Sequence, residues 1–175
     1  SSVLSMAEEK ADQFKMAVAS SDLAQVKEIC EDLDPSMLNV TCKNLGGETP
    51  FAYAVLHTGN KIIEYLIEAN ADVNAISRGN LTPLHHAAYT GNTNLIQLLI
   101  EKGANIDALD SQKHSPLYYA VKGRHVDATL LLVQNGANKD YARPTEYKSA
   151  NNNLFSEKTP TKITPEEYKL LKHIK

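Results

Sequence analysis

The sequence predicts an all-α solenoid of about four stacked helix pairs, with short turns or hairpins between the repeats and a C-terminal capping helix. The first observation behind this fold class is an internal repeat, because Thr49-Pro50, Thr82-Pro83 and Ser115-Pro116 are spaced 33 residues apart. The second is that apolar residues after each dipeptide follow a helical spacing. One helix pair of this length cannot bury its own apolar face, so neighbouring pairs are expected to stack.

Each repeat carries start and stop signals for two helices. Thr or Ser before Pro is typical of a helix start, since the hydroxyl caps the helix and proline is tolerated at its first position. A second helix, buried on most of its circumference, is predicted in the middle copy by Leu95, Ile96, Leu98, Leu99 and Ile100. Left-handed residues that end this second helix are expected at Asn70, Gly103 and Gly136.

Both ends of the chain depart from the strict period. Residues 1–13 are predicted as an N-terminal extension and the start of a capping helix, and residues 14–43 as a divergent N-terminal capping repeat. Three regular repeats are predicted at 44–76, 77–109 and 110–142. Residues 143–163 are polar and predict an exposed loop or linker. Residues 164–175 predict a C-terminal helix, which either covers the open end of the stack, the favoured reading, or begins another repeat.

Composition excludes several classes of function. The chain has 18 Lys and Arg against 21 Asp and Glu, a formal charge of −3, so nucleic-acid binding is not expected. No apolar run approaches the ~18 residues of a membrane-spanning helix, so membrane insertion is not expected either. Cys30 and Cys42 form no CxxC pair, which argues against a disulfide scaffold and a cysteine zinc site. We expect an intracellular monomer, cytoplasmic and/or nuclear.

No sequence pattern indicates catalysis. His57, His114 and His125 lie at three different positions of the repeat, whereas a zinc ion needs imidazoles about 2 Å from one point. The motifs HExxH, GxSxG, GxxxxGK[ST] and GxGxxG are absent from the sequence. We therefore predict that the chain is not an enzyme and uses no cofactor and no metal.

The middle copy, TPLHHAAYTGNTNLIQLLIEKGANIDA (residues 82–108), resembles the ankyrin-repeat family, whose 33-residue unit carries Thr-Pro-Leu-His. The resemblance covers residues 44–141 approximately. It implies that His85 is structural and hydrogen-bonds turn backbone. Thr58 and Arg124 replace the inter-helix glycine that Gly91 retains, and the neighbouring Gly59 and Gly123 predict turns of shifted register. Asn80 and Lys113 replace the turn glycine that Gly47 retains.

The resemblance also implies a protein–protein interaction module, a scaffold or adaptor that binds a protein partner through its turn tips and concave helix face. Family binding positions carried onto this chain are Leu45, Glu48, Leu56, His57, Ile76, Arg78, Leu81, Tyr89, Thr90, Leu109, Ser111, Gln112, His114 and Lys122. Ile76, Leu81, Tyr89 and Leu109 are the most informative, because exposed apolar residues in adjacent repeats fit an interface core.

Two other functions remain open on the sequence. The array could be a regulatory or targeting segment of a larger enzyme. It could also be a stand-alone stoichiometric inhibitor or assembly chaperone. Repeat folds host unrelated functions, and the residues do not identify the partner.

Overall fold

The computed structural model describes residues 3–142 and Lys169. The predicted loop at 143–163 and, Lys169 aside, the predicted helix at 164–175 lie outside the described residues. The helices are α1 (Val3–Ala19), α2 (Leu23–Glu31), α3 (Pro50–His57), α4 (Asn60–Glu68), α5 (Pro83–Thr90), α6 (Thr93–Glu101), α7 (Pro116–Lys122) and α8 (Val126–Gln134). Short 3₁₀ turns are η1 (Pro35–Asn39), η2 (Lys43–Leu45), η3 (Arg78–Asn80) and η4 (Lys139–Ala142).

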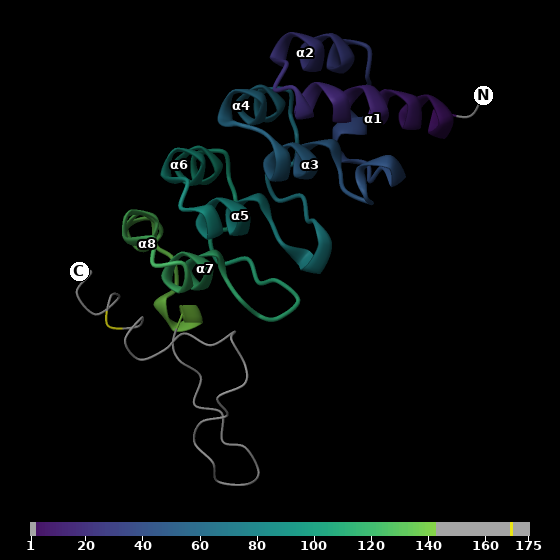
Figure 1. Cartoon of the computed structure of the whole chain (residues 1–175). Helices are drawn as coiled ribbons and strands as arrows, with labels where there is room; N and C mark the ends of the chain where they lie inside the picture. Colours follow the sequence, from purple (N-terminus) through teal and green to yellow (C-terminus); the bar gives the residue numbers. More distant parts are fainter. Residues whose placement is uncertain (1–2, 143–168, 170–175) are drawn as a thin grey trace, which may run out of the picture.

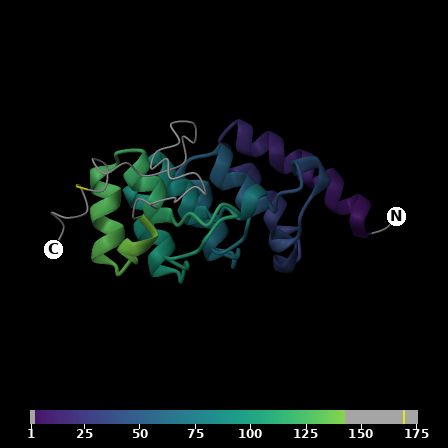
Figure 2. The same cartoon turned by 90° about the horizontal axis from the view of Figure 1, so that it is seen from below.

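The helices form two rows (Figure 1). One row, here called the inner row, contains the first helix of each pair: α1, α3, α5 and α7. The outer row contains α2, α4, α6 and α8, and the turns that precede α3, α5 and α7 project from the inner row. Figure 2 shows the same stack from below, running from α1 at one end to α8 at the other. The predicted all-α solenoid of four helix pairs is confirmed.

The predicted helix starts are confirmed by their caps. The hydroxyls of Thr49, Thr82 and Ser115 accept hydrogen bonds from backbone N–H groups three residues later, at 3.1, 3.3 and 3.2 Å. Proline occupies the first turn of α3, α5 and α7, where its missing N–H has no partner to lose.

Left-handed residues end the outer helices as predicted. Asn70, Gly103 and Gly136 have φ values of 66°, 92° and 91°. The predicted register shift next to Gly123 is wrong, because Arg124 itself takes the left-handed conformation of Gly91 (φ 57° and 69°). The turn after α3 does differ: Thr58 has φ −140°, in the extended region.

A single apolar core runs through the stack. In the inner row, Phe14, Phe51, Leu84 and Leu117 recur at one repeat position and are fully buried. In the outer row Leu66, Leu99 and Leu132 do the same. Because each of these side chains belongs to one continuous cluster, every repeat completes the burial of its neighbours.

Polar side chains set the spacing between the loops of successive repeats. The Asn39 side-chain oxygen accepts a hydrogen bond from Asp72 N, that of Asn74 from Asn105 N, and that of Asp107 from Asn138 N, at 2.8, 2.8 and 2.9 Å. These bonds satisfy loop backbone groups that no helix could pair, and they hold each loop on the next.

Candidate functional site

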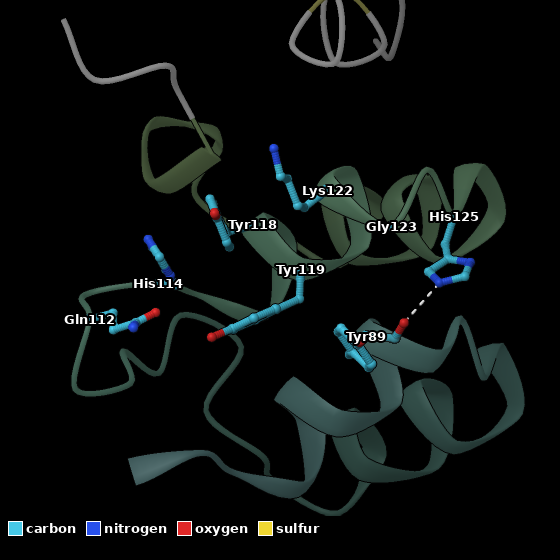
Figure 3. A pocket seen from close by; sticks show the side chains of 8 residues that line it. All are labelled: Tyr89, Gln112, His114, Tyr118, Tyr119, Lys122, Gly123 and His125. Carbon is cyan, nitrogen blue, oxygen red and sulfur yellow. Dashed lines mark hydrogen bonds between the residues drawn. The ribbon is translucent and has the colours of Figure 1, made fainter. Parts of the chain in front are cut away.

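An aromatic cluster lies across the inner faces of the second and third regular repeats. It consists of Tyr89 from α5, His114 from the turn before α7, and Tyr118 and Tyr119 from α7 (Figure 3). The His114 and Tyr118 rings stack with centroids 3.7 Å apart. The Tyr119 ring meets the other three edge-on, with centroids 5.3 to 6.2 Å away. Edge-to-face contacts of this kind fix ring orientation as well as burying area.

The Asp110 carboxylate fixes the positions of the turn before α7 and of Tyr119 in the aromatic cluster. One carboxylate oxygen accepts hydrogen bonds from Gln112 N and His114 N, both at 2.9 Å, and so shapes the turn. The other oxygen accepts the Tyr119 hydroxyl. Burial by itself would raise the pKa of Asp110, but these hydrogen bonds hold it below its usual value. Burial, followed by the neighbouring carboxylate, raises the pKa of Tyr119, so its hydroxyl stays a donor.

His85 connects two successive repeats. Thr82 N donates to His85 Nδ1 at 3.0 Å, so the proton lies on Nε2, which donates to the carbonyl of His114 at 2.9 Å. Burial lowers the pKa of His85 and keeps the imidazole neutral, as this pair of bonds requires. The structural role expected for His85 is confirmed.

His125 makes a second connection between repeats. Its Nε2 donates to the Tyr89 carbonyl at 2.8 Å, the dashed line in Figure 3. The His125 ring lies against Gly91 and Gly123, where an added Cβ would come within 2.6 and 2.7 Å of ring atoms. Both glycines are therefore needed for the close approach of this ring.

Three hollows adjoin Tyr89. The first, of about 500 Å³, lies between α5 and α7 and is lined by the aromatic cluster together with Gln112, Lys122, Gly123 and His125. The second, of about 760 Å³, lies beside α3 and α5 and includes Leu56, His57 and Thr90. The third, of about 190 Å³, is lined by Leu81, His85, His86 and Tyr119. Tyr89 lines all three and is 64% exposed.

The hollows collect eight of the fourteen residues predicted from the sequence. These are Leu56, His57, Leu81, Tyr89, Thr90, Gln112, His114 and Lys122. Four others are exposed outside the three hollows: Ile76, Arg78, Leu109 and Ser111.

The prediction that Leu45 and Glu48 belong to the binding surface is wrong, because both side chains are buried. Leu45 is 2% exposed because η2 turns its side chain into the core, and Glu48 is 7% exposed. The Glu48 carboxylate accepts a hydrogen bond from Arg78 N at 3.3 Å, so the turn of the next repeat covers it. Leu81 was also expected to face solvent, but it is half-buried in the third hollow.

Sequence reasoning missed part of the site. The residues Tyr118, Tyr119, His125 and Asp110 are absent from the binding positions predicted from the sequence. One signal was available: Asp110 lies four residues before His114, within reach of the turn backbone, as in other turns built on an Asp side chain.

Comparison with known families agrees with this architecture. The family model for an ankyrin repeat matches residues 46–75, and the one for ankyrin repeats (3 copies) matches residues 76–143. Together the two matches span more than half of the chain. The chain belongs to the ankyrin-repeat family. Ankyrin repeats are generally protein–protein interaction modules and are typically not catalytic. No curated protein matches this ankyrin-repeat chain.

The part of the chain that the structure describes offers neither a metal cluster nor a membrane-spanning helix. Among the residues that the structure describes, no group of three or more His, Cys, Asp or Glu side chains could hold a metal ion. Within the same described part of the chain, no helix has both the length and the apolar character needed to cross a bilayer.

Proposed function

We propose that this ankyrin-repeat chain is a non-enzymatic protein-binding module whose partner contacts the surface centred on Tyr89. The observation that carries the proposal is that Tyr89 lines three adjoining hollows while its side chain remains 64% exposed. Exposed apolar area that gathers beside a hollow is typical of an interaction site, and tyrosine is enriched there because it combines a large apolar ring with a polar hydroxyl.

The surroundings of Tyr89 are ordered before any partner binds. Tyr119 is tied to Asp110, and the Tyr89 carbonyl to His125. Side chains and backbone held in this way lose little conformational entropy on association, so more of the contact energy appears as affinity.

The chemistry of the surface also suits a protein interface. Leu56 and Leu81 supply apolar area on either side of Tyr89, and Thr90, Gln112 and Lys122 supply polar groups at the margin. An apolar centre with a polar rim is the usual composition of a protein-binding patch.

Affinity capture from a lysate of the source cells tests the proposal. We compare the full chain with its Tyr89→Ala variant, and use Val126→Ala as the matched control, since Val126 is 57% exposed on the outer row. Truncating a central aromatic anchor costs about 2 kcal/mol or more, or about thirty-fold in Kd. Proteins retained by wild type and by Val126→Ala should therefore be lost by Tyr89→Ala.

Unfolding measurements show whether Tyr89→Ala loses its partners because the variant is unfolded. Because Tyr89 is exposed and its contact with Tyr119 is a single edge-to-face pair, Tyr89→Ala should lower the free energy of unfolding by no more than about 1.5 kcal/mol and leave the chain folded. Leu81→Ala is a poorer probe, since its half-buried side chain also contributes to stability. Equal capture by wild type and Tyr89→Ala, with both folded, would refute the proposal.

A further inference from the structure

Charge is unevenly distributed over the array. Three inner segments, residues 43–57, 76–90 and 109–122, each contain a turn and the inner helix that follows it. Together they carry four basic residues and two acidic ones, whereas residues 1–142 as a whole carry eleven Lys and Arg against seventeen Asp and Glu. The inner segments therefore reverse the charge balance of the chain that contains them.

Both acids of the inner segments are withdrawn from solvent. Glu48 is 7% exposed and Asp110 is 5% exposed. Their carboxylates accept hydrogen bonds from backbone N–H groups, Glu48 from Arg78 and Asp110 from Gln112 and His114. These bonds offset part of each negative charge where a ligand would approach.

The basic residues of the same segments, in contrast, are accessible to solvent. Lys43, Arg78 and Lys113 are exposed at the turns, and Lys122 is half-exposed beside the first hollow. The formal charges that the inner segments present to water are consequently all positive.

The outer row has the opposite character. Its exposed acids include Glu28, Glu31, Glu64, Glu68, Glu101 and Asp127. Because α1 also carries exposed acids at Glu8, Glu9 and Asp12, the excess positive charge of the array is confined to the three inner segments. An anionic ligand is therefore attracted to these segments rather than to α1 or to the outer helices.

We propose that the inner segments bind an acidic, extended peptide segment of the partner, which places one aromatic or large apolar side chain against Tyr89. The inference rests on the proposed function and specifies the chemistry of the partner. Complementary charge steers encounter and fixes the register of a bound segment, and the aromatic anchor supplies most of the affinity.

Two other occupants fit the same surface less well. The chain's own residues 143–175 carry seven Lys and Arg against four Asp and Glu, the same sign as the inner segments. A single-stranded nucleic acid would offer bases to stack on tyrosine, but its affinity depends on many phosphate contacts. Four basic residues on a chain of net charge −3 provide few of these.

A phage-displayed library of random peptides, panned on the full chain, is the probe. Clones that bind wild type and also Tyr89→Ala are discarded, which leaves peptides that need the Tyr89 surface. We expect the retained peptides to have an excess of Asp and Glu around one aromatic or large apolar residue. Their Kd should rise steeply between ~0.01 M and ~1 M ionic strength, as the Debye length falls from about 30 Å to about 3 Å.

Charge reversal on the two faces shows whether the position of the charge matters, with two substitutions on the inner segments and one on the outer row. Lys43→Glu combined with Lys113→Glu should weaken a retained peptide about ten-fold, mainly through slower association. Lys61→Glu, near the start of α4 in the outer row, changes the charge in the same direction and should alter Kd less than two-fold. Glu is compatible with the first turn of a helix, so this control should remain folded.

The outcomes separate the two proposals. Retained peptides that are neutral or basic, or a Kd unaffected by the double reversal, would overturn the acidic partner while leaving Tyr89 as the binding site. A library with no peptide dependent on Tyr89 would overturn both. Tight binding of a poly-uridine oligonucleotide, lost in the double reversal, would overturn the peptide in favour of nucleic acid.

Discussion

At the residue scale, Gly91 after α5 and Gly103 after α6 are both required in left-handed turns, but for different reasons. Gly91 has φ 69°, a conformation that side chains disfavour, and a Cβ there would lie 2.6 Å from His125 Nδ1. Gly103 has φ 92°, but a Cβ there would have no neighbouring heavy atom within 4 Å. A substitution at Gly103 therefore introduces backbone strain alone, whereas one at Gly91 introduces both backbone strain and a steric clash.

We predict that Gly103→Ala lowers the free energy of unfolding by about 1–2 kcal/mol, the cost of a left-handed residue with a side chain. Gly91→Ala should lower it by roughly 1–3 kcal/mol more, because the new methyl group also displaces His125 from the Tyr89 carbonyl. Urea denaturation measures both. In a His125→Ala background the difference between the two glycine variants should disappear, and its persistence there would contradict the steric explanation.

At the element scale, each outer helix is stabilised by the repeats on either side of it. Leu99 in α6 and Leu132 at the same repeat position in α8 are fully buried within the continuous core, whereas Leu130 in α8, at the repeat position of Gln97, is 37% exposed. Chemically identical side chains in equivalent outer helices thus differ in what they bury.

We predict that Leu99→Ala costs about 2–5 kcal/mol, from lost apolar burial and the cavity that remains. Leu130→Ala should cost less than about 1 kcal/mol. Because neighbouring repeats stabilise one another, Leu99→Ala should shift the whole denaturation curve. A separate early transition, with the remaining repeats unaffected, would show that the repeats unfold independently.

At the scale of the whole molecule, buried imidazoles couple stability to pH. Burial lowers the pKa values of His85, His86 and His114 from their usual 6.5, against the opposing effect of the Asp110 carboxylate on His85 and His114. The folded state therefore binds protons less readily than the unfolded state does. The stabilisation is complete above pH 6.5 and is lost as the pH falls below that value.

We predict a free energy of unfolding that is nearly constant above pH 6.5 and falls below it, by at most about 1.4 kcal/mol per pH unit for each histidine. Asp110 has a usual pKa of 3.8, lowered in this fold, so it contributes only at more acidic pH. Thermal denaturation between about pH 7.5 and pH 5 measures the slope. His85→Gln, which removes one titrating group, should reduce it, and an unchanged slope would contradict this assignment.

The sequence by itself determined the repeat, the helix starts and the helix ends. Thr82 caps its helix through a residue three positions away, and Asn70 ends its helix through its own backbone conformation. Interactions this local depend on a few consecutive residues, so the 33-residue period and the residues that start and end each helix were sufficient to predict the helices. Arg124 shows the limit, since it takes a left-handed conformation that glycine usually supplies.

Only the tertiary structure decided which residues form the surface. Leu45, Glu48 and Leu81 occupy family binding positions, yet the core or the following turn covers each of them wholly or in part. Conversely, His125 reaches the Tyr89 carbonyl 36 residues earlier in the chain. The exposure of a side chain and the position of an aromatic ring depend on which residues of the next repeat pack against them. Those residues are about 33 positions away in the sequence, so no local pattern predicts the contact.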